Sequence, residues 1–191
     1  MLDPYLWIHF SGLAAAPLLL EIVWLSLALG YAISPLEILP VALLGMLPIF
    51  WMQWNKPFNI YSLLLWVIKH EVLTTEQRQV LSLYKSRSQK ILALVVSLLM
   101  LVMLWLIYKQ APLASGIAEN FLPPIRIFGL ALATIAFGLA NLFVQVALST
   151  LLVMVTLGKD PTSLIPWEIE KIKNDFTSIG LPVRQILPPM Q

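Results

Sequence analysis

The stretch from Ile127 to Leu157, IFGLALATIAFGLANLFVQVALSTLLVMVTL, contains 31 consecutive residues without a charged side chain. A helix of about 20 apolar residues crosses the hydrocarbon core of a bilayer, so this segment is long enough to span a membrane. Three further apolar segments are Ser11–Leu29, with Glu21 inside it, Leu36–Met52 and Ile91–Ile107. Hydrophobic residues make up 59% of the 191-residue chain and charged residues 12%, which is unlike a soluble domain. The sequence therefore predicts an all-α integral membrane protein.

We expect one membrane domain over residues 1–191, with four transmembrane helices in a bundle. Their predicted bounds are 6–29, 36–53, 90–108 and 126–157, which leaves a loop at 54–89 and a tail at 158–191. The chain has no cysteine, and this excludes disulfides, thiolate metal sites and iron–sulfur clusters. The first ten residues contain no Lys or Arg, so we expect the first apolar segment to be retained rather than cleaved.

Basic residues are unevenly distributed between the two sides that four crossings would create. Ten of the twelve lie in the loop after the second span or in the tail: Lys56, Lys69, Arg78, Lys85, Arg87, Lys90, Lys159, Lys171, Lys173 and Arg184. The opposite side receives Lys109 and Arg126. Because cytoplasmic loops carry the excess of Lys and Arg, both termini are predicted on the cytoplasmic side, or the stromal side of a thylakoid. The net charge of +2 does not indicate a nucleic-acid partner.

Local patterns predict several helix ends. Asp3 before Pro4 is typical of a helix start, and Thr74 with Gln77 fits a capping box. Since nothing between residues 75 and 107 breaks a helix, the third span is expected to continue downward as a helical stalk. The apolar run 58–68 is too short to cross a bilayer, so we expect an interfacial helix there, with a re-entrant segment as the alternative.

The tail contains one predicted amphipathic helix. Its apolar stripe runs at helical spacing through Ile165, Ile169, Ile172 and Phe176, next to Trp167. Pro166 and acidic residues at the start are typical of a helix N-terminus. We expect this helix to lie on the membrane or to dock on a partner, which makes Trp167, Ile169, Ile172 and Phe176 candidate interaction residues.

Small and polar residues share one face of the fourth predicted span. They follow at steps of three or four: Thr134, Gly138, Asn141, Gln145 and Ser149. Lipid offers such side chains no hydrogen bonds, so this face is expected to contact other helices, either within the bundle or in a partner. Helix packing is the favoured interpretation, and a site for a pigment, lipid or quinone headgroup is the alternative.

Glu21 is the one charged residue deep inside a predicted span. At the helical rise of 1.5 Å per residue it lies about 15 Å beyond Ser11. Intramembrane acids are costly and often functional. The favoured hypothesis is structural pairing, for example with Asn141 or Gln145; ligation of a pigment or ion and proton handling are the alternatives.

Few residues suggest chemistry. His9 and His70 are the two histidines, and both fall near the predicted cytoplasmic interface, where amphipathic side chains are common. His9 is retained as a weaker ligand candidate because histidine binds metals and tetrapyrroles. No paired carboxylates, nucleophile with a base, phosphate loop or metal-binding motif is present in the sequence. We therefore expect no enzymatic activity and no metal cluster.

Several phrases of the sequence resemble a known family. They are Leu2-Asp3-Pro4-Tyr5-Leu6-Trp7-Ile8-His9, Gly12-Leu13-Ala14-Ala15-Ala16-Pro17, Trp51-Met52-Gln53-Trp54 and Ile165-Pro166-Trp167-Glu168-Ile169-Glu170. Together they resemble the cyanobacterial low-complexity tail membrane proteins, over residues 2 to about 186. The resemblance implies a thylakoid location and an association with photosynthetic complexes; it supplies no catalytic residues.

Three functions follow as hypotheses. The first is a structural or assembly subunit that contacts the bilayer and other membrane proteins. The second is a protein that binds chlorophyll, carotenoid, quinone or lipid through Glu21, His9 or the Asn141 and Gln145 face. The third is a proton- or ion-translocating subunit that uses Glu21.

Overall fold

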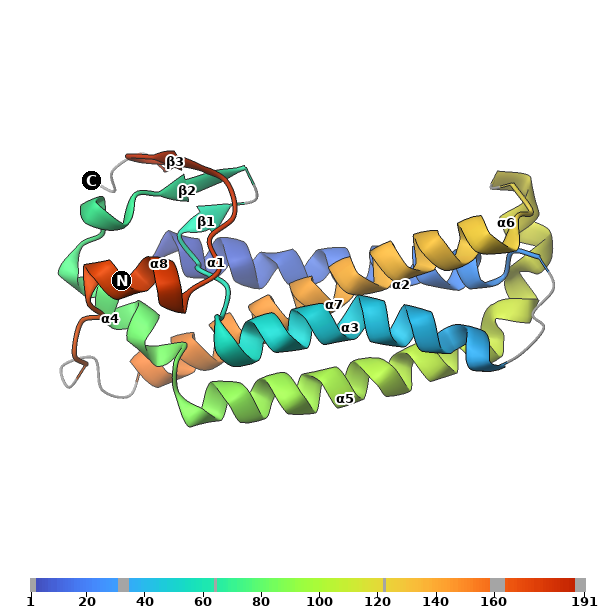
Figure 1. The fold of residues 1–191 in the computed structure, drawn as a ribbon, viewed down its shortest axis with the longest axis horizontal. Helices are drawn as coiled ribbons and strands as arrows, with labels where there is room; N and C mark the ends of the chain where they lie inside the picture. The colour runs from blue at the N-terminus through green and yellow to red at the C-terminus, as the bar shows by residue number, and fades with distance from the viewer. Residues whose placement is uncertain (1–2, 31–34, 64, 122, 159–163, 188–191) are drawn as a thin grey trace. The chain divides into compact units, whose positions relative to one another are not determined.

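The computed structural model describes residues 3–30, 35–63, 65–121, 123–158 and 164–187. Within them, four helical stretches are long and apolar enough to cross a membrane: Pro4–Leu27, Pro35–Asn55, Arg87–Phe121 and Arg126–Leu157. Figure 1 shows the fold, which is helical apart from one small sheet. The predicted all-α class with four candidate spans is therefore confirmed.

The first two stretches show how local sequence sets helix geometry. Asp3 caps α1 (Pro4–Ser11), accepting a hydrogen bond from the Tyr5 backbone N at 3.0 Å. A 3₁₀ turn, η1 (Gly12–Ala14), separates α1 from α2 (Ala15–Leu27). This turn lies just before Pro17, whose ring interferes with the carbonyl four residues earlier and whose N cannot donate. The next helices are η2 (Pro35–Glu37) and α3 (Ile38–Asn55).

The chain forms two compact units, which we call the helical unit and the mixed unit. The helical unit comprises residues 12–50 and 94–145, and the mixed unit the described residues of 1–11, 51–93 and 146–191. The remaining elements of the helical unit come from α5 (Arg87–Gln110), η4 (Ala111–Ala114), α6 (Ser115–Phe121) and α7 (Arg126–Leu157). Helices α3, α5 and α7 each contribute residues to both units.

Helices of the helical unit pack through small residues. A Cβ atom built on Gly129 would lie 2.5 Å from the Ser26 carbonyl oxygen, and one on Gly45 would lie 2.8 Å from the Phe137 ring. Helix α7 also buries Ala133, Ala136 and Ala140. Small residues permit this close approach of backbones, which is the usual basis of helix packing in membranes.

The mixed unit joins three distant segments around one hydrophobic core. Its elements are β1 (Ser62–Leu63), β2 (Trp66–Ile68), η3 (His70–Val72), α4 (Thr75–Leu83), α8 (Ile169–Asp175), β3 (Leu181–Val183) and α1. The core includes Leu6 from the N-terminal segment, Tyr61 and Leu81 from the loop, and Ile172 from the tail. These three segments, far apart in the sequence, therefore form one packed unit.

The expected interfacial helix at 58–68 is wrong, since part of this segment forms a β-hairpin. Strands β1 and β2 pair antiparallel, and β2 pairs in parallel with β3 in the register Trp66 to Leu181. Hydrogen bonds run from Leu181 N to Leu65 O at 2.8 Å and from Lys69 N to Val183 O at 2.9 Å. The aromatic and β-branched residues suit a strand, but the strand that completes the sheet lies far along the chain.

The expected stalk from residue 75 to 107 is also wrong, although its capping box is confirmed. Thr74 Oγ1 accepts from Gln77 N at 3.2 Å, and Gln77 Oε1 accepts from Thr74 N at 3.1 Å. Helix α4 ends at Leu83, and α5 begins at Arg87. The buried Tyr84 hydroxyl lies 3.0 Å from Thr150 Oγ1 in α7, so a tertiary contact holds the residue at the break.

Candidate interaction site

The predicted polar face of α7 is occupied by the protein's own helices. Asn141 and Gln145 are buried in the helical unit. Gln145 Nε2 donates to Ser97 Oγ in α5 at 2.9 Å and to Asn141 Oδ1 at 3.1 Å. Thr134 donates to the Leu130 carbonyl of its own helix at 2.8 Å. The bond between Gln145 and Ser97 thus connects α7 to α5, whereas the other two bonds lie within α7.

The other two members of that face, Gly138 and Ser149, also lie close to other helices of the chain. A Cβ on Gly138 would lie 3.5 Å from the Gly45 carbonyl oxygen, so two backbones pass close to each other here. In the mixed unit, Ser149 Oγ donates to Gln89 Oε1 at 2.5 Å, and Gln89 Nε2 donates to the Ser149 carbonyl at 3.0 Å. The residues of this face therefore lie in contacts within the chain.

The predicted stripe of the tail also turns inward. Ile172 and Phe176 are buried in the core of the mixed unit, whereas Ile169 is exposed. Trp167 packs edge-on against the Phe176 ring, with 6.0 Å between ring centroids. Ile165 precedes α8 and is exposed. In this conformation, Ile172, Phe176 and much of Trp167 serve the fold rather than an external surface.

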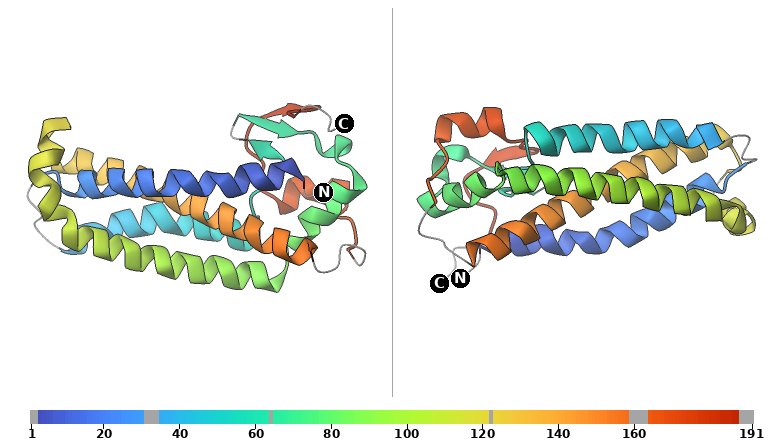
Figure 2. Two further views of the ribbon diagram at one scale, coloured as in Figure 1. Left: turned by 180° about the vertical axis from the view of Figure 1, so that it is seen from behind. Right: turned by 90° about the horizontal axis from the view of Figure 1, so that it is seen from below.

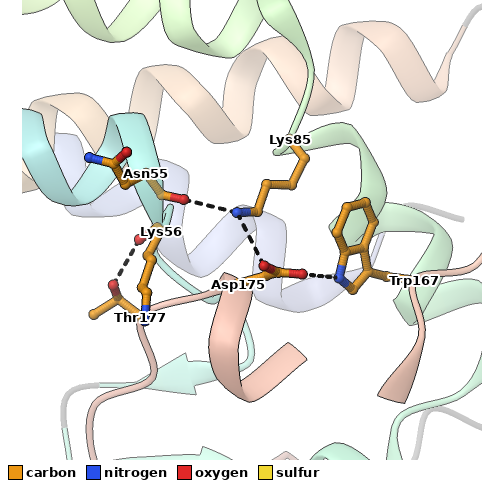
Figure 3. Close-up of polar contacts among 6 residues, drawn as sticks. All are labelled: Asn55, Lys56, Lys85, Trp167, Asp175 and Thr177. Carbon is orange, nitrogen blue, oxygen red and sulfur yellow. Dashed lines mark hydrogen bonds and ion pairs between the residues drawn. The ribbon is translucent and has the colours of Figure 1, made fainter. Parts of the chain in front are cut away.

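Polar contacts connect the tail to the end of α3 and to Lys85, between α4 and α5 (Figure 3). Lys85 Nζ donates to the Asn55 carbonyl at 2.9 Å and lies 4.0 Å from Asp175 Oδ1. The other carboxylate oxygen of Asp175 accepts from Trp167 Nε1 at 3.1 Å, and Thr177 Oγ1 donates to the Lys56 carbonyl at 2.7 Å. Burial lowers the pKa of the Lys85 ammonium, and Asp175 partly opposes that shift.

The two histidines do not converge on a ligand site. His9 Nε2 lies 2.8 Å from the Ile60 carbonyl oxygen, and its ring packs edge-on against Phe58. His70 Nε2 lies 3.4 Å from Ser178 Oγ at the surface. Within the described ranges, no group of three or more His, Cys, Asp or Glu side chains is placed to hold a metal ion.

Glu21, the predicted acidic candidate, is exposed and available to an outside group. It lies on the exposed face of α2, inside the candidate span Pro4–Leu27, beside the exposed residues Pro17, Leu18 and Ile22. The expected pairing with Asn141 or Gln145 is not formed. In the part of the chain that the structure describes, Glu21 makes no hydrogen bond or ion pair.

Comparison with known proteins places the chain in a family. Residues 2–188 match the family described as low-complexity tail membrane protein-like. The chain belongs to this family. No curated protein and no solved structure matches it. Membership confirms the family that the sequence resembles and agrees with a membrane protein; the family description states no reaction, ligand or partner.

In this low-complexity tail membrane protein-like chain, the sequence-based predictions did not include a partly buried ion pair. Arg126 at the start of α7 contacts Glu37 in η2, within the helical unit. Both residues lie at the ends of apolar segments, where Arg126 served above as one of two basic residues on the opposite side. The sequence places an acidic residue at the start of the second span and a basic residue at the start of the fourth, and these opposite charges could have predicted the pair.

Proposed function

We propose that this protein is a structural or assembly subunit of a membrane complex and that α2 binds a transmembrane helix of another subunit at Glu21. The observation that carries the proposal is the position of Glu21, an acidic side chain exposed within an apolar span without a partner in the described chain. Association with photosynthetic complexes of the thylakoid extends this proposal and is supported by the family resemblance.

Energetics favour a partner at this position. An acidic residue at the centre of a lipid-exposed helix costs about 2.5–3.5 kcal/mol on insertion scales. Glu21 lies between the centre and the Leu27 end of the span Pro4–Leu27, so its cost is smaller. A neighbouring helix that supplies Lys, Arg, Asn or Ser at the same depth would offset part of that cost with a hydrogen bond or an ion pair. Ala14, in η1 just before α2, is also exposed, and a small side chain allows another backbone to approach.

The ligand-binding alternative now depends on the same carboxylate. Asn141 and Gln145 are hydrogen-bonded inside the helical unit, and His9 Nε2 contacts a backbone carbonyl. Of the four ligand candidates, Glu21 is therefore the one open to a pigment or quinone from outside. A helix from another subunit is the better fit, because the whole exposed side of α2 around Glu21 is apolar.

The test compares variants at Glu21 on native gels of gently solubilised membranes. We expect the wild type to migrate in a complex larger than its own 21.5 kDa. Glu21→Leu should release the protein from that complex, whereas Glu21→Gln should retain part of the association because an amide still forms hydrogen bonds. Glu71→Gln, at an exposed acid outside the spans, is the matched control.

Two results would count against the proposal. If the wild type migrates as a free monomer, the protein is not part of a stable complex. If Glu21→Leu migrates like the wild type, Glu21 does not contribute to the interface of that complex. An absorption spectrum of each purified variant separates the ligand alternative. A pigment that is bound by a monomeric wild type and lost in Glu21→Leu would assign Glu21 to that pigment.

A further inference from the structure

The segment formed by η4 and α6, residues 111–121, exposes large apolar side chains at regular spacing. Leu113 and Phe121 are 80% and 76% exposed, and Ile117 between them is also exposed, so steps of four place all three on one side. Ala111, Ala114 and Ala118 are buried against the helical unit. Gly116, Glu119 and Asn120 are exposed on the remaining side. The segment is thus amphipathic, and its alanine side packs against the helical unit.

Aromatic residues at the end of α5 indicate where the segment lies relative to the membrane surface. Trp105 and Tyr108 stack with 5.9 Å between ring centroids, and Lys109 Nζ lies 5.3 Å from the centre of the Trp105 ring. Trp24 of α2 donates from Nε1 to the Gln110 carbonyl at 3.0 Å. Trp, Tyr and Lys concentrate where a spanning helix meets the headgroups. The segment begins at the next residue, Ala111.

The direction of the segment changes at this point. Figures 1 and 2 show α6 turned away from the direction of α5 and lying across the ends of α2 and α7 within the helical unit. A helix that leaves a span at the headgroup level and then runs across the span lies along the bilayer surface. Its three exposed apolar residues are then beside lipid, like exposed Ile125 and Ile127 at the start of the next span.

We infer that residues 111–121 form an interfacial anchor, with Leu113, Ile117 and Phe121 inserted at the boundary between headgroups and acyl chains. The occupant of this apolar face is the bilayer that the protein already crosses. Amphipathic helices bind in this way, with the apolar side a few ångströms into the acyl region and the polar side in water. The anchor would fix the height of the α5–α7 connection relative to the membrane, independently of any partner at Glu21.

The natural absence of cysteine permits a direct test by single-site spin labelling. Single cysteines would be introduced at Leu113, Ile117 and Phe121, and separately at Gly116, Glu119 and Asn120, in the full chain. Each variant is purified, labelled with a nitroxide and reconstituted in phosphatidylcholine liposomes. Collision with oxygen, which concentrates in lipid, is compared with collision with a water-soluble nickel chelate. Labels at Leu98 and Glu71 supply the lipid-exposed and water-exposed references.

We expect labels at Leu113, Ile117 and Phe121 to collide mainly with oxygen, as at Leu98. Labels at Gly116, Glu119 and Asn120 should collide several-fold more with the nickel chelate. Two outcomes overturn the inference. Equal nickel accessibility of both sets would place the segment in water, and exclusion of both reagents from the apolar set would mean that protein covers it. Because the liposomes contain no other protein, failure of this inference leaves the proposal for Glu21 standing.

Discussion

Arg126 donates a hydrogen bond from Nε to Glu37 Oε2 at 2.7 Å, while its Nη1 donates to the carbonyls of Leu27 at 2.7 Å and Leu29 at 3.0 Å. One guanidinium thereby connects the end of α2, the start of α7 and η2. The carbonyls at a helix C-terminus carry partial negative charge, so a cation is favoured there. Gly30 has a φ of +67°, a backbone conformation that a larger residue adopts only with strain.

Removal of one member of this pair should destabilise the helical unit. The Arg126 and Glu37 side chains are 15% and 19% exposed, so the loss of either leaves a largely buried charge. We expect Arg126→Met to cost roughly 2–4 kcal/mol, somewhat below the value for a fully enclosed pair. Thermal unfolding of the purified protein in mild detergent measures the change.

The double variant Arg126→Met with Glu37→Met is the informative control for that prediction. Because it removes both charges, it should be more stable than Arg126→Met alone. If the double variant lost as much stability as the sum of the two single variants, the contact would contribute nothing as a pair.

Gly180 should be essential for the pairing of β2 with β3. Its φ of +123° is rare for any other residue, and a Cβ there would lie 2.6 Å from the Trp66 backbone N. Gly180→Ala should therefore lower the stability of the mixed unit by at least about 2 kcal/mol. Gly116→Ala in α6, where a Cβ meets nothing within 4 Å, should be neutral or slightly stabilising. Equal melting temperatures of the two variants would contradict this assignment.

Gln145 should stabilise the helical unit through its two buried hydrogen bonds. Gln145→Leu keeps the apolar volume but removes the contacts with Ser97 and Asn141, and we expect a loss of about 1 kcal/mol, as for other hydrogen bonds between membrane helices. Thr134→Val should cost less, since the Thr134 hydroxyl bonds within its own helix. Reversible unfolding in detergent mixtures ranks the two variants; a larger loss for Thr134→Val would refute this order.

The orientation that the basic residues predict can be tested with single cysteines in the cysteine-free chain. Ser86→Cys lies between α4 and α5 in the mixed unit, and Ser115→Cys begins α6. Since Lys and Arg favour the cytoplasmic side, a membrane-impermeant maleimide should label Ser115→Cys in right-side-out vesicles. Ser86→Cys should react once the vesicles are permeabilised. The reverse labelling pattern would show that the orientation is opposite to the predicted one. Labelling of both cysteines from outside would show that the chain does not cross the membrane between Ser86 and Ser115.

The candidate spans could be read from the sequence because hydropathy is a local property. Apolar runs of sufficient length identify the four helices without knowledge of their neighbours. Helix starts were equally local: the Asp3 cap and the Thr74–Gln77 capping box each involve residues at most three apart. Such interactions depend on side chains within one turn, so the same pattern gives the same geometry in most contexts.

The sheet and the break before α5 could not be read in this way. The apolar run before Lys69 lacks a helix breaker, and its partner strand at Leu181–Val183 lies in the tail. Likewise, residues 84–86 show no local stop signal, and the Tyr84 hydroxyl finds Thr150 on a helix far along the chain. Contacts between distant segments override weak local preferences, and the sequence pattern does not show which distant segments meet.

The sequence by itself determined that the chain is a helical membrane protein, where its spans lie, and that Glu21, Asn141 and Gln145 are unusual inside them. The tertiary structure decided which of these residues face inward. Packing of α7 against α5 encloses Gln145 beside Ser97, whereas the packed side of α2 is the one opposite Glu21. Helical periodicity fixes which residues share a face, but the side from which a neighbouring helix approaches is set by packing of the whole bundle.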